Sequence, residues 1–274
     1  MLLAGLFIST AASAQSDIGE SLVVELSNPG QPGRLKLHLV QGGITVTAYD
    51  GKEVIITPTA RKHDDDCDDC DHDHDDHSSN RDGMTRINTG QSVNITVTQD
   101  NNFVNVATES WNSARNFDIK VPRNFDLMLK TVNEGNIVVR GVHGDHDLSN
   151  VNGEIIVESL NGSLVANTVN GDIRATFTGI NKEVPMAFTT LNGNVDLTFP
   201  KAAAFNIKLQ TQRGEVFTDF PWETLASKPK VERSSNGGTT RVKIEDWTYG
   251  KINGGGPEYL FKSFHGDIYI RQQK

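Results

Sequence analysis

The chain has 274 residues, enough for one large hydrophobic core or two small ones, and its 36% hydrophobic and 22% charged residues are typical of a soluble globular protein. With 25 Gly and 9 Pro, the composition favours strands and tight turns over helices. The formal net charge of -9 comes from residues 63–77, because the rest of the chain carries 26 acidic and 26 basic residues. A neutral remainder without a basic stripe excludes a nucleic-acid-binding protein.

Residues 1–14 have the pattern of a secretory signal peptide. An apolar run from Leu2 to Ile8 leads to small residues that end in Ala12-Ser13-Ala14, an A-x-A cleavage pattern, so Gln15 is the expected mature start. A buried N-terminal strand is the alternative interpretation. No later segment approaches about 18 uninterrupted apolar residues, so we expect no membrane span. The sequence predicts an exported protein.

Residues 15–130 are expected to form the N-terminal strands of the fold. Residues 22–60 alternate between apolar and polar positions and are divided by Gly-containing breaks, and similar alternation resumes over residues 92–122. Between these runs, residues 61–83 are acidic and polar, and we interpret them as a solvated loop.

Residues 131–274 contain an internal repeat marked by glycine. Five glycines follow one another at intervals of nine residues, and Asn precedes the last three: Gly135, Gly144, Gly153, Gly162 and Gly171. Positions two and four residues after each glycine are apolar, which places them on one face of a strand. Each unit is therefore predicted to be a turn followed by a strand with one buried face. His146 is the one polar residue among these expected core positions.

The spacing beyond Gly171 favours a coil with two sides. Gly193 and Gly214 follow at intervals of 22 and 21 residues, so every second turn can lengthen. A unit of about 18 to 22 residues predicts an all-β fold, a flattened β-solenoid of stacked, Gly-cornered coils. An antiparallel meander is the alternative, because Asn-Gly is also a hairpin signal. In the solenoid we expect one interior column formed by Ile137, Ile155, Leu164, Ile173 and Val195.

Several segments of the chain, taken in order, resemble the bacterial putative-adhesin family. They are GGITVTAYDGKEVIITPTA (residues 42–60), VPRNFDLMLKTVNEGNIVV (121–139), VNGEIIVESLNGSLVANTVNGDI (151–173) and YGKINGGGPEYLFKSFHGDIYI (249–270). The resemblance covers nearly all of the chain after residue 14. It implies a secreted β-solenoid in the periplasm or on the surface of a Gram-negative bacterium, and it supplies no catalytic residues.

The acidic segment departs from that family pattern and carries the strongest chemical signal. It holds both Cys and half of the eight His of the chain, and its candidate metal ligands are His63, Cys67, Cys70, His72, His74 and His77. Cys-x2-Cys with neighbouring His suits Zn²⁺, and His-rich tracts also bind Ni²⁺ or Cu²⁺. A purely solvated loop and a Cys67–Cys70 disulfide are the alternatives.

Other polar positions are interpreted as parts of the repeat. His143 and His265 precede a repeat Gly, where Asn stands elsewhere, and are expected to be turn residues. The acids that follow repeat glycines, among them Asp145 and Asp172, are expected to form a ladder along a corner. One or both of Trp222 and Trp247 are expected to cap the end of the solenoid, with a sugar-binding platform as the alternative.

The sequence therefore predicts an exported structural or adhesion-like binding module without catalytic activity. No nucleophile, zinc-protease, P-loop or dinucleotide motif is present. The expected partner is an envelope or surface ligand, either a glycan or a protein. A polysaccharide-processing β-helix enzyme and a periplasmic metal buffer or sensor are the alternatives. The first of these needs a cluster of Asp, Arg or Lys on one strand face, and the outward positions Ile156, Val165 and Arg174 do not provide one.

Overall fold

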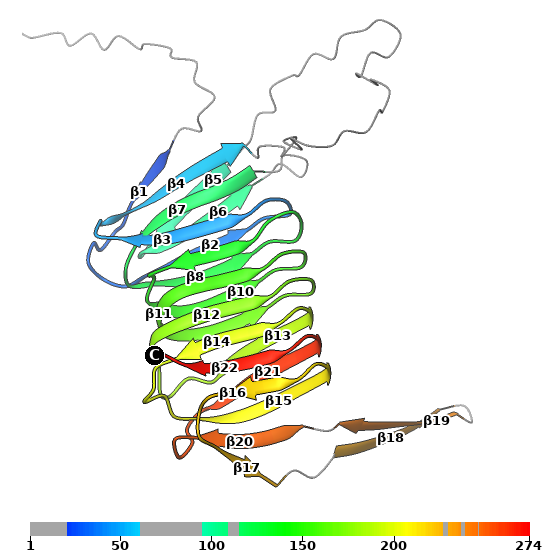
Figure 1. Cartoon of the computed structure of the whole chain (residues 1–274). Helices are drawn as coiled ribbons and strands as arrows, with labels where there is room; N and C mark the ends of the chain where they lie inside the picture. Colours follow the sequence, from blue (N-terminus) through cyan, green and yellow to red (C-terminus); the bar gives the residue numbers. More distant parts are fainter. Residues whose placement is uncertain (1–20, 61–94, 109–114, 227–229, 237–238, 246) are drawn as a thin grey trace, which may run out of the picture.

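The computed structural model describes residues 21–60, 95–108, 115–226, 230–236, 239–245 and 247–274, and every regular element in these ranges is a β-strand (Figure 1). The described part contains no helix that could cross a membrane. Twenty of the described strands form one continuous sheet, which winds into a stack with two walls. The all-β solenoid expected from the sequence is confirmed.

The two walls are defined by the strands that pair within them. Wall 1 consists, in spatial order, of β1 (Leu22–Glu25), β4 (Glu53–Ala60), β7 (Arg115–Pro122), β3 (Ile44–Tyr49), β9 (Ile137–Arg140), the first half of β11 (Ile155–Asn167), β12 (Ile173–Ile180), β14 (Val195–Phe199), β22 (Ile268–Gln272) and β16 (Val216–Thr218). Wall 2 consists of β5 (Ile95–Asp100), β6 (Phe103–Thr108), β2 (Gly33–His38), β8 (Phe125–Lys130), β10 (Gly144–Ser149), the second half of β11, β13 (Met186–Asn192), β21 (Glu258–His265), β15 (Phe205–Arg213), β20 (Thr248–Ile252) and β17 (Trp222–Leu225). A separate hairpin pairs β18 (Lys230–Asn236) with β19 (Thr239–Glu245).

Parallel pairing between coils gives each wall a continuous interior column. On wall 1, Ile137 lies opposite Ile155, Ile155 opposite Ile173, and Ile173 opposite Val195. All four side chains have no exposed surface. The fifth expected member of this column, Leu164, was placed wrongly: it pairs with His146 on wall 2. Nine residues are half a coil, so consecutive repeat glycines alternate between the two corners and their strands alternate between the walls.

The first and last complete coils are inserted between other coils of the stack. The coil of β2 and β3 lies between that of β6 and β7 and that of β8 and β9. The coil of β21 and β22 lies between β13 and β14 on one side and β15 and β16 on the other. This insertion brings Tyr259 into an aromatic cluster, where its ring stacks on Phe205 with centroids 4.5 Å apart. Burial raises the pKa of Tyr259 to about 12.

Glycine is required at corner 1, the turn that leads into the strands of wall 1. A Cβ atom at Gly171 would overlap the carbonyl oxygen of Gly153 in the adjacent coil, and φ at Gly171 is +151°. The same close approach recurs at Gly135, Gly153, Gly193, Gly214 and Gly266. Corner 2, which leads into wall 2, has the equivalent contact between Gly162 and Gly144.

Polar side chains satisfy the backbone where the glycines approach. Buried Thr190 donates a hydrogen bond of 2.9 Å to the carbonyl oxygen of Gly171, and Ser263 donates one of 3.0 Å to that of Gly193. These hydroxyl groups satisfy carbonyl oxygens that water cannot reach, because the backbone is tightly stacked there. Thr131, Asn150, Thr168 and Thr211 act in the same way in other coils.

Candidate ligand-binding groove

The metal ligands expected from the sequence, His63, Cys67, Cys70, His72, His74 and His77, lie outside the described residues, as does the rest of the acidic segment 61–83. Among the residues that the structure does describe, no group of three or more His, Cys, Asp or Glu is placed to hold a metal ion. In the sequence, the acidic segment lies between β4 and β5.

The residues that precede the corner glycines form an amide ladder. At corner 1, Asn152 donates 2.8 Å to Asn133, Asn170 donates 2.8 Å to Asn152, and Asn192 donates 2.8 Å to Asn170. His265 continues the ladder, with its Nδ1 3.0 Å from the side-chain oxygen of Asn192 and its Nε2 3.2 Å from Arg213. A turn role for His265, rather than a catalytic one, is consistent with these contacts.

The residues that follow the corner glycines form a second ladder, in which side-chain oxygens accept backbone amides. Asp172 accepts the amide of Asn194 at 2.8 Å, and Asn194 accepts that of Asp267 at 2.8 Å. Asp145 was expected in the same ladder, but it lies at corner 2, where it accepts the hydroxyl of Ser163 at 2.6 Å. The reason is again the alternation of corners every nine residues.

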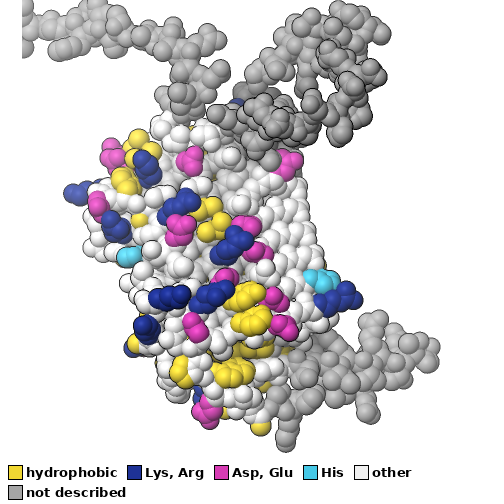
Figure 2. Space-filling view, in the orientation of Figure 1, with side chains coloured by type: hydrophobic (Ala, Val, Ile, Leu, Met, Phe, Trp, Pro, Cys, Tyr) yellow, Lys and Arg dark blue, Asp and Glu magenta, His cyan; other side chains and the backbone are white. Residues whose placement is uncertain are grey.

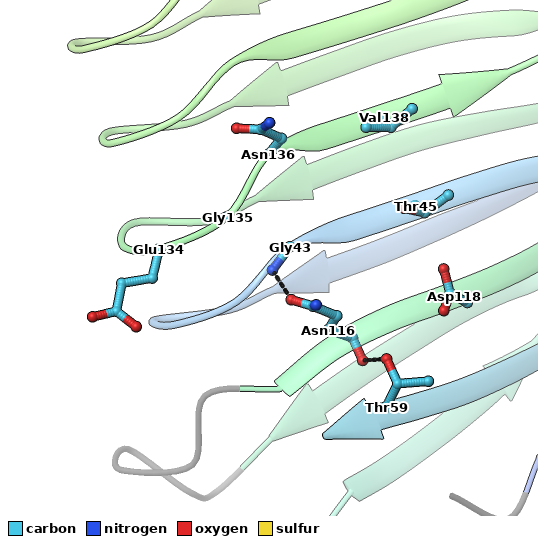
Figure 3. Close-up of a pocket in the computed structure, with 9 residues that line it drawn as sticks. All are labelled: Gly43, Thr45, Thr59, Asn116, Asp118, Glu134, Gly135, Asn136 and Val138. Carbon is cyan, nitrogen blue, oxygen red and sulfur yellow. Dashed lines mark hydrogen bonds between the residues drawn. The ribbon is translucent and has the colours of Figure 1, made fainter. Parts of the chain in front are cut away.

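A polar depression with a volume of about 440 Å³ opens on the outer face of wall 1, close to corner 1 (Figure 3). The depression forms because Gly43 and Gly135 have no side chains and the side chains of Thr45 and Val138 are short. Thr45 and Val138 lie opposite one another on β3 and β9. The other lining residues are Thr59, Asn116, Asp118, Glu134 and Asn136.

The lining of this polar depression is suited to hydroxyl groups. Carboxylates at Asp118 and Glu134 accept hydrogen bonds, the amides of Asn116 and Asn136 can both donate and accept, and the Thr hydroxyls do both as well. Asn116 is held in place by the backbone, because its side-chain oxygen accepts the amide of Gly43 at 2.8 Å. The hydroxyl of Thr59 donates to the carbonyl of Asn116 at 3.4 Å (Figure 3).

A second depression, with a volume of about 300 Å³, continues along the same wall. It begins at Ile156, which lies beside Val138 in the pairing of β9 with β11, so the two depressions adjoin. Its other lining residues are Val157, Glu158, Arg174, Ala175, Thr176, Asp196, Thr198 and Arg271. We call the two depressions together the wall-1 groove.

The arginines of the wall-1 groove are already paired with carboxylates. Arg174 bonds to Asp172 at 2.7 Å and to Glu154 at 3.0 Å. Arg271 bonds to both oxygens of Asp196, at 2.7 and 3.1 Å, and this hydrogen bonding raises the pKa of Arg271. The groove therefore offers no unpaired cation from these two residues to an anionic ligand.

An aromatic pair lies at the C-terminal end of the groove. Tyr269 stacks on Phe217, with ring centroids 5.1 Å apart and planes inclined by 11°, and the guanidinium of Arg271 lies 4.7 Å from the Tyr269 ring. The hydroxyl of Tyr269 donates to Asp267 at 3.0 Å, and this bond raises the pKa of Tyr269. Figure 2 shows apolar side chains interspersed with charged ones of both signs along this face of the stack.

Sequence reasoning identified only part of this surface. Ile156 and Arg174 were recognised as outward positions and do line the groove, whereas Val165 faces outward on wall 2. The two tryptophans lie elsewhere, since Trp222 packs against Gly250 at the end of wall 2 and Trp247 lies 4.7 Å from the ammonium group of Lys208. The alternating outward residues were visible in the sequence, but their assignment to one wall depends on the coil register.

Residues 129–253 match the Toastrack DUF4097 family. This match confirms the resemblance drawn from the repeat motifs. The Toastrack region spans the coils from the end of β8 to β20, and the inserted strands β21 and β22 follow it. No curated protein matches the chain.

Two crystal structures resemble this chain over most of its length at low identity. One is described as a putative cell adhesion protein from Clostridium sporogenes, with 10% identity, 93% of this chain and 100% of that chain covered, and a TM-score of 0.42. The other is described as a putative adhesin from Bacteroides fragilis, with 12% identity, coverage of 93% and 96%, and a TM-score of 0.41.

Proposed function

We propose that this protein is a non-catalytic, adhesion-like binding module, exported to the cell envelope, that binds a neutral glycan along the wall-1 groove. The observation that carries the proposal is the continuity of the groove: Val138 and Ile156 lie side by side and join its two depressions. A ligand that follows the groove must be elongated, because the groove crosses successive coils of the stack.

The chemistry of the lining supports a sugar ligand. Hydroxyl, amide and carboxylate groups around Asp118 and Asn136 can hydrogen-bond sugar hydroxyls, while Val138, Ile156 and the Tyr269–Phe217 pair offer apolar contact to sugar ring faces. Because Arg174 and Arg271 are paired with carboxylates, a polyanion would meet more negative than positive charge.

A binding role fits the groove better than a catalytic one. The residues described as lining it include no His, Cys, Ser or Lys, and its carboxylates Glu158 and Asp196 are already paired with Arg140 and Arg271. Residues 1–14 support export, because they have the apolar run and cleavage pattern of a signal peptide.

The test compares two matched variants in one strand. Ile156 and Val165 are both half-buried, outward residues of β11, but Ile156 faces the groove on wall 1 and Val165 faces solvent on wall 2. We expect affinity electrophoresis of the mature protein in gels containing dextran, mannan or hydroxyethyl cellulose to show retardation. Ile156→Arg should abolish it, and Val165→Arg should leave it unchanged.

Three results would overturn the proposal. The first is that none of the neutral polysaccharides retards the protein, and the second is that alginate, a polyanion, retards it more strongly than they do. The third is that both Arg variants lose binding equally, which would show that the contact is not made in the wall-1 groove. Thermal melting of both variants checks that they remain folded.

We also propose that the acidic segment binds a divalent transition metal, on the strength of its composition. Half of the His and both Cys of the chain lie within residues 63–77, and neutral imidazole and thiolate are the ligands that Zn²⁺, Ni²⁺ and Cu²⁺ prefer. The ligands would come from His63, Cys67, Cys70, His72, His74 and His77. Binding should strengthen as pH rises through about 6.5, where histidine becomes neutral.

Calorimetry of the mature protein with each metal tests this second proposal. Deleting residues 64–76 should abolish binding while the melting temperature stays the same, because the segment lies between β4 and β5 and outside the Gly-cornered repeats. Equal metal binding by the intact protein and the deletion variant would show that the segment is a solvated acidic insert and not a metal site.

A further inference from the structure

The outer faces of the two walls differ in charge over the central coils. Wall 1 presents charged side chains there, such as Arg174 and Arg271, and both are held in ion pairs. The outward positions of β11 and β13 on wall 2 are uncharged and half-buried instead: Val165, Asn167, Ala187 and Thr189. Depletion of charge is typical of the core of a protein–protein interface.

A column of apolar side chains runs along the edge of the same wall-2 surface, next to corner 1. Each member comes directly before a residue of the amide ladder or its equivalent, and backbone hydrogen bonds stack the members coil on coil. The amide of Asn170 donates 2.8 Å to the carbonyl oxygen of Val151, and that of Asn192 donates 2.8 Å to the carbonyl oxygen of Val169. The members of this apolar column are Val40, Val132, Val151, Val169, Leu191 and Phe264.

Exposed apolar surface in the body of the stack is concentrated in the apolar column. Among the described residues, nine large apolar side chains are exposed. Val40, Val169 and Leu191 belong to the column, with exposed fractions of 37%, 37% and 44%. The others lie in β1, β6, β16 and β17, at the ends of the stack: Leu22, Val23, Phe103, Val216, Phe217 and Trp222. A continuous exposed apolar surface away from the ends indicates an interaction site.

Charges of opposite sign stand towards the two ends of this surface. The apolar column and the two outward columns beside it form what we call the wall-2 face, which crosses β8, β10, β11, β13, β21 and β15. On β10, the exposed Asp147 lies beside Val165. On β21 and β15, the ammonium groups of Lys262 and Lys208 lie 5.9 and 4.7 Å from the centre of the Trp247 ring. These charges are complementary when one copy is inverted relative to another.

A two-fold axis that runs parallel to the strands, midway between β11 and β13, matches the apolar and the charged positions together. It lays β11 of one copy on β13 of the other, so that Val169 meets Leu191. It lays β10 on β21, which brings Asp147 near Lys262 and Lys208 of the other copy. Stacked sheets lie about 10 Å apart, a distance that two facing side chains fill.

The outer strands of the wall-2 face fit in the same orientation, in which β8 lies on β15 of the other copy. Met128 then lies against Trp247, which covers Lys208, and a thioether beside an aromatic ring is a favourable contact. Lys130 lies opposite Gln210 rather than opposite another cation.

The size of the wall-2 face suits a weak dimer. From the spacing of its six strands and three outward columns, the face measures roughly 29 Å along the stack and roughly 20 Å across it. Contact over this face would bury roughly 600 Å² on each copy, less than the ~800 Å² of a standard interface. We therefore expect a dimer that dissociates on dilution.

From these observations we propose that two copies of this chain pack wall-2 face against wall-2 face through a two-fold axis. The contact is isologous, so the assembly closes at two copies. Wall 1 remains uncovered on both copies, and the dimer presents two wall-1 grooves that point away from each other. The dimer goes beyond the proposed glycan binding and does not depend on it.

Sedimentation velocity of the mature protein over a wide concentration range tests for this dimer. The wild type is expected to pass from monomer to dimer as the concentration rises and to form nothing larger. Val169→Lys and Leu191→Lys each place a charge in the centre of the contact, so each should raise the dissociation constant at least about tenfold. Val23→Lys is the matched control, because Val23 is 51% exposed on β1 of wall 1, and this variant should dimerise like the wild type.

Charge reversal tests the orientation of the two copies. Asp147→Lys in one chain, and Lys208→Glu with Lys262→Glu in another, each place like charges together in a dimer of identical chains. Each variant alone should therefore dimerise more weakly than the wild type. An equal mixture restores both attractions, so it should form dimers that contain one chain of each kind.

The proposal is overturned by a wild type that stays monomeric at its highest soluble concentration, or by dimerisation of Val169→Lys and Leu191→Lys as strong as that of the wild type. It is also overturned if the charge-reversed chains associate no better when mixed than alone. Circular dichroism checks that the variants are folded, and either lysine variant carries the test if the other is not.

Discussion

The side-chain oxygen of Asn194 accepts a hydrogen bond of 2.8 Å from the backbone amide of Asp267, although 73 positions separate the two residues. Asp267 in turn accepts the amide of Glu215 at 2.8 Å, from 52 positions earlier in the chain. The last coil is therefore clamped between two coils that follow one another directly in sequence. Its removal leaves a gap inside the stack rather than a shorter stack.

Truncation after Gly256 tests that arrangement. Without β21 and β22, the strands β13, β14 and β15 each lose one of two pairing partners, and β16 loses the one it has among the described strands. The aromatic cluster loses Tyr259. Hydrogen exchange should show that β13 and β15 lose protection. Replacing the separate hairpin β18–β19 with a short Gly-Ser linker removes a similar length of chain and should leave that protection unchanged. Full protection of β13 in the truncated chain would contradict the insertion.

Ile173→Asp should unfold the domain or destabilise it by more than about 4 kcal/mol, because it buries an unpaired charge in the interior column. Asp172→Asn, one residue away, should cost less than about 1 kcal/mol, since it loses only an exposed pairing with Arg174. Asn can still accept the amide of the next coil, as Asn194 does. Urea denaturation measures both changes, and equal losses would mean that the inward face is wrongly assigned.

Gly171→Ala should cost about 3 kcal/mol or more, because the new Cβ overlaps the Gly153 carbonyl and the backbone has a φ of +151°. Gly254→Ala is the comparison: φ is +85°, but nothing lies within 4 Å of its Cβ position. Its cost should be only the backbone strain of about 1–2 kcal/mol. Similar melting temperatures for the two variants would show that close stacking at the corner contributes little.

His146→Leu should stabilise the protein, most of all in acid. His146 is 3% exposed between Leu127 and Leu164, its Nε2 donates to the Val142 carbonyl at 3.2 Å, and its Nδ1 has no partner among the described groups. Burial lowers its pKa from the ordinary 6.5, although Asp126 and Asp145 nearby act in the opposite direction. As the pH falls, His146 therefore binds a proton at a higher pH in the unfolded chain than in the folded one. The free energy of unfolding decreases as the pH drops below 6.5 towards the lowered pKa of His146.

Urea denaturation at several pH values between 8 and 5 checks this prediction, with the gain at neutral pH expected to be about 1 kcal/mol or more, as for an unsatisfied buried polar group. The advantage of the Leu variant should widen as the pH falls. Stability curves that stay parallel would show that His146 is not protonated on unfolding in this range.

The repeat was predictable because its signals are local. Each repeat has a glycine that must approach another backbone and an apolar residue two positions later. These two signals recur whichever strand the repeat pairs with, so the coil length and buried positions such as Ile155 and Ile173 could be predicted from the spacing. The assignment of Leu164 failed because the sequence period is nine residues and the structural period is 18. Local periodicity cannot distinguish one corner from two.

The insertion of the end coils and the wall-1 groove could not be predicted in this way. Gly266, like Gly193, is followed two positions later by a buried apolar residue, yet its coil lies between those of Gly193 and Gly214. Only the complementarity of non-local partners, such as Tyr259 with Phe205, selects that order. The groove depends on the same order, because Asp118, Thr45 and Val138 become neighbours on one wall only through it.

The same clamped coil makes the two ends of the molecule mechanically unequal. A force applied through the N-terminus acts on β1, which has one described neighbour and can be peeled away from β4 one hydrogen bond at a time. A force applied through the C-terminus acts on β22, which is bonded to β14 on one side and to β16 on the other, so two ladders share the load. A molecule tethered by its C-terminus would therefore stay folded under a tension that unfolds a molecule tethered by its N-terminus.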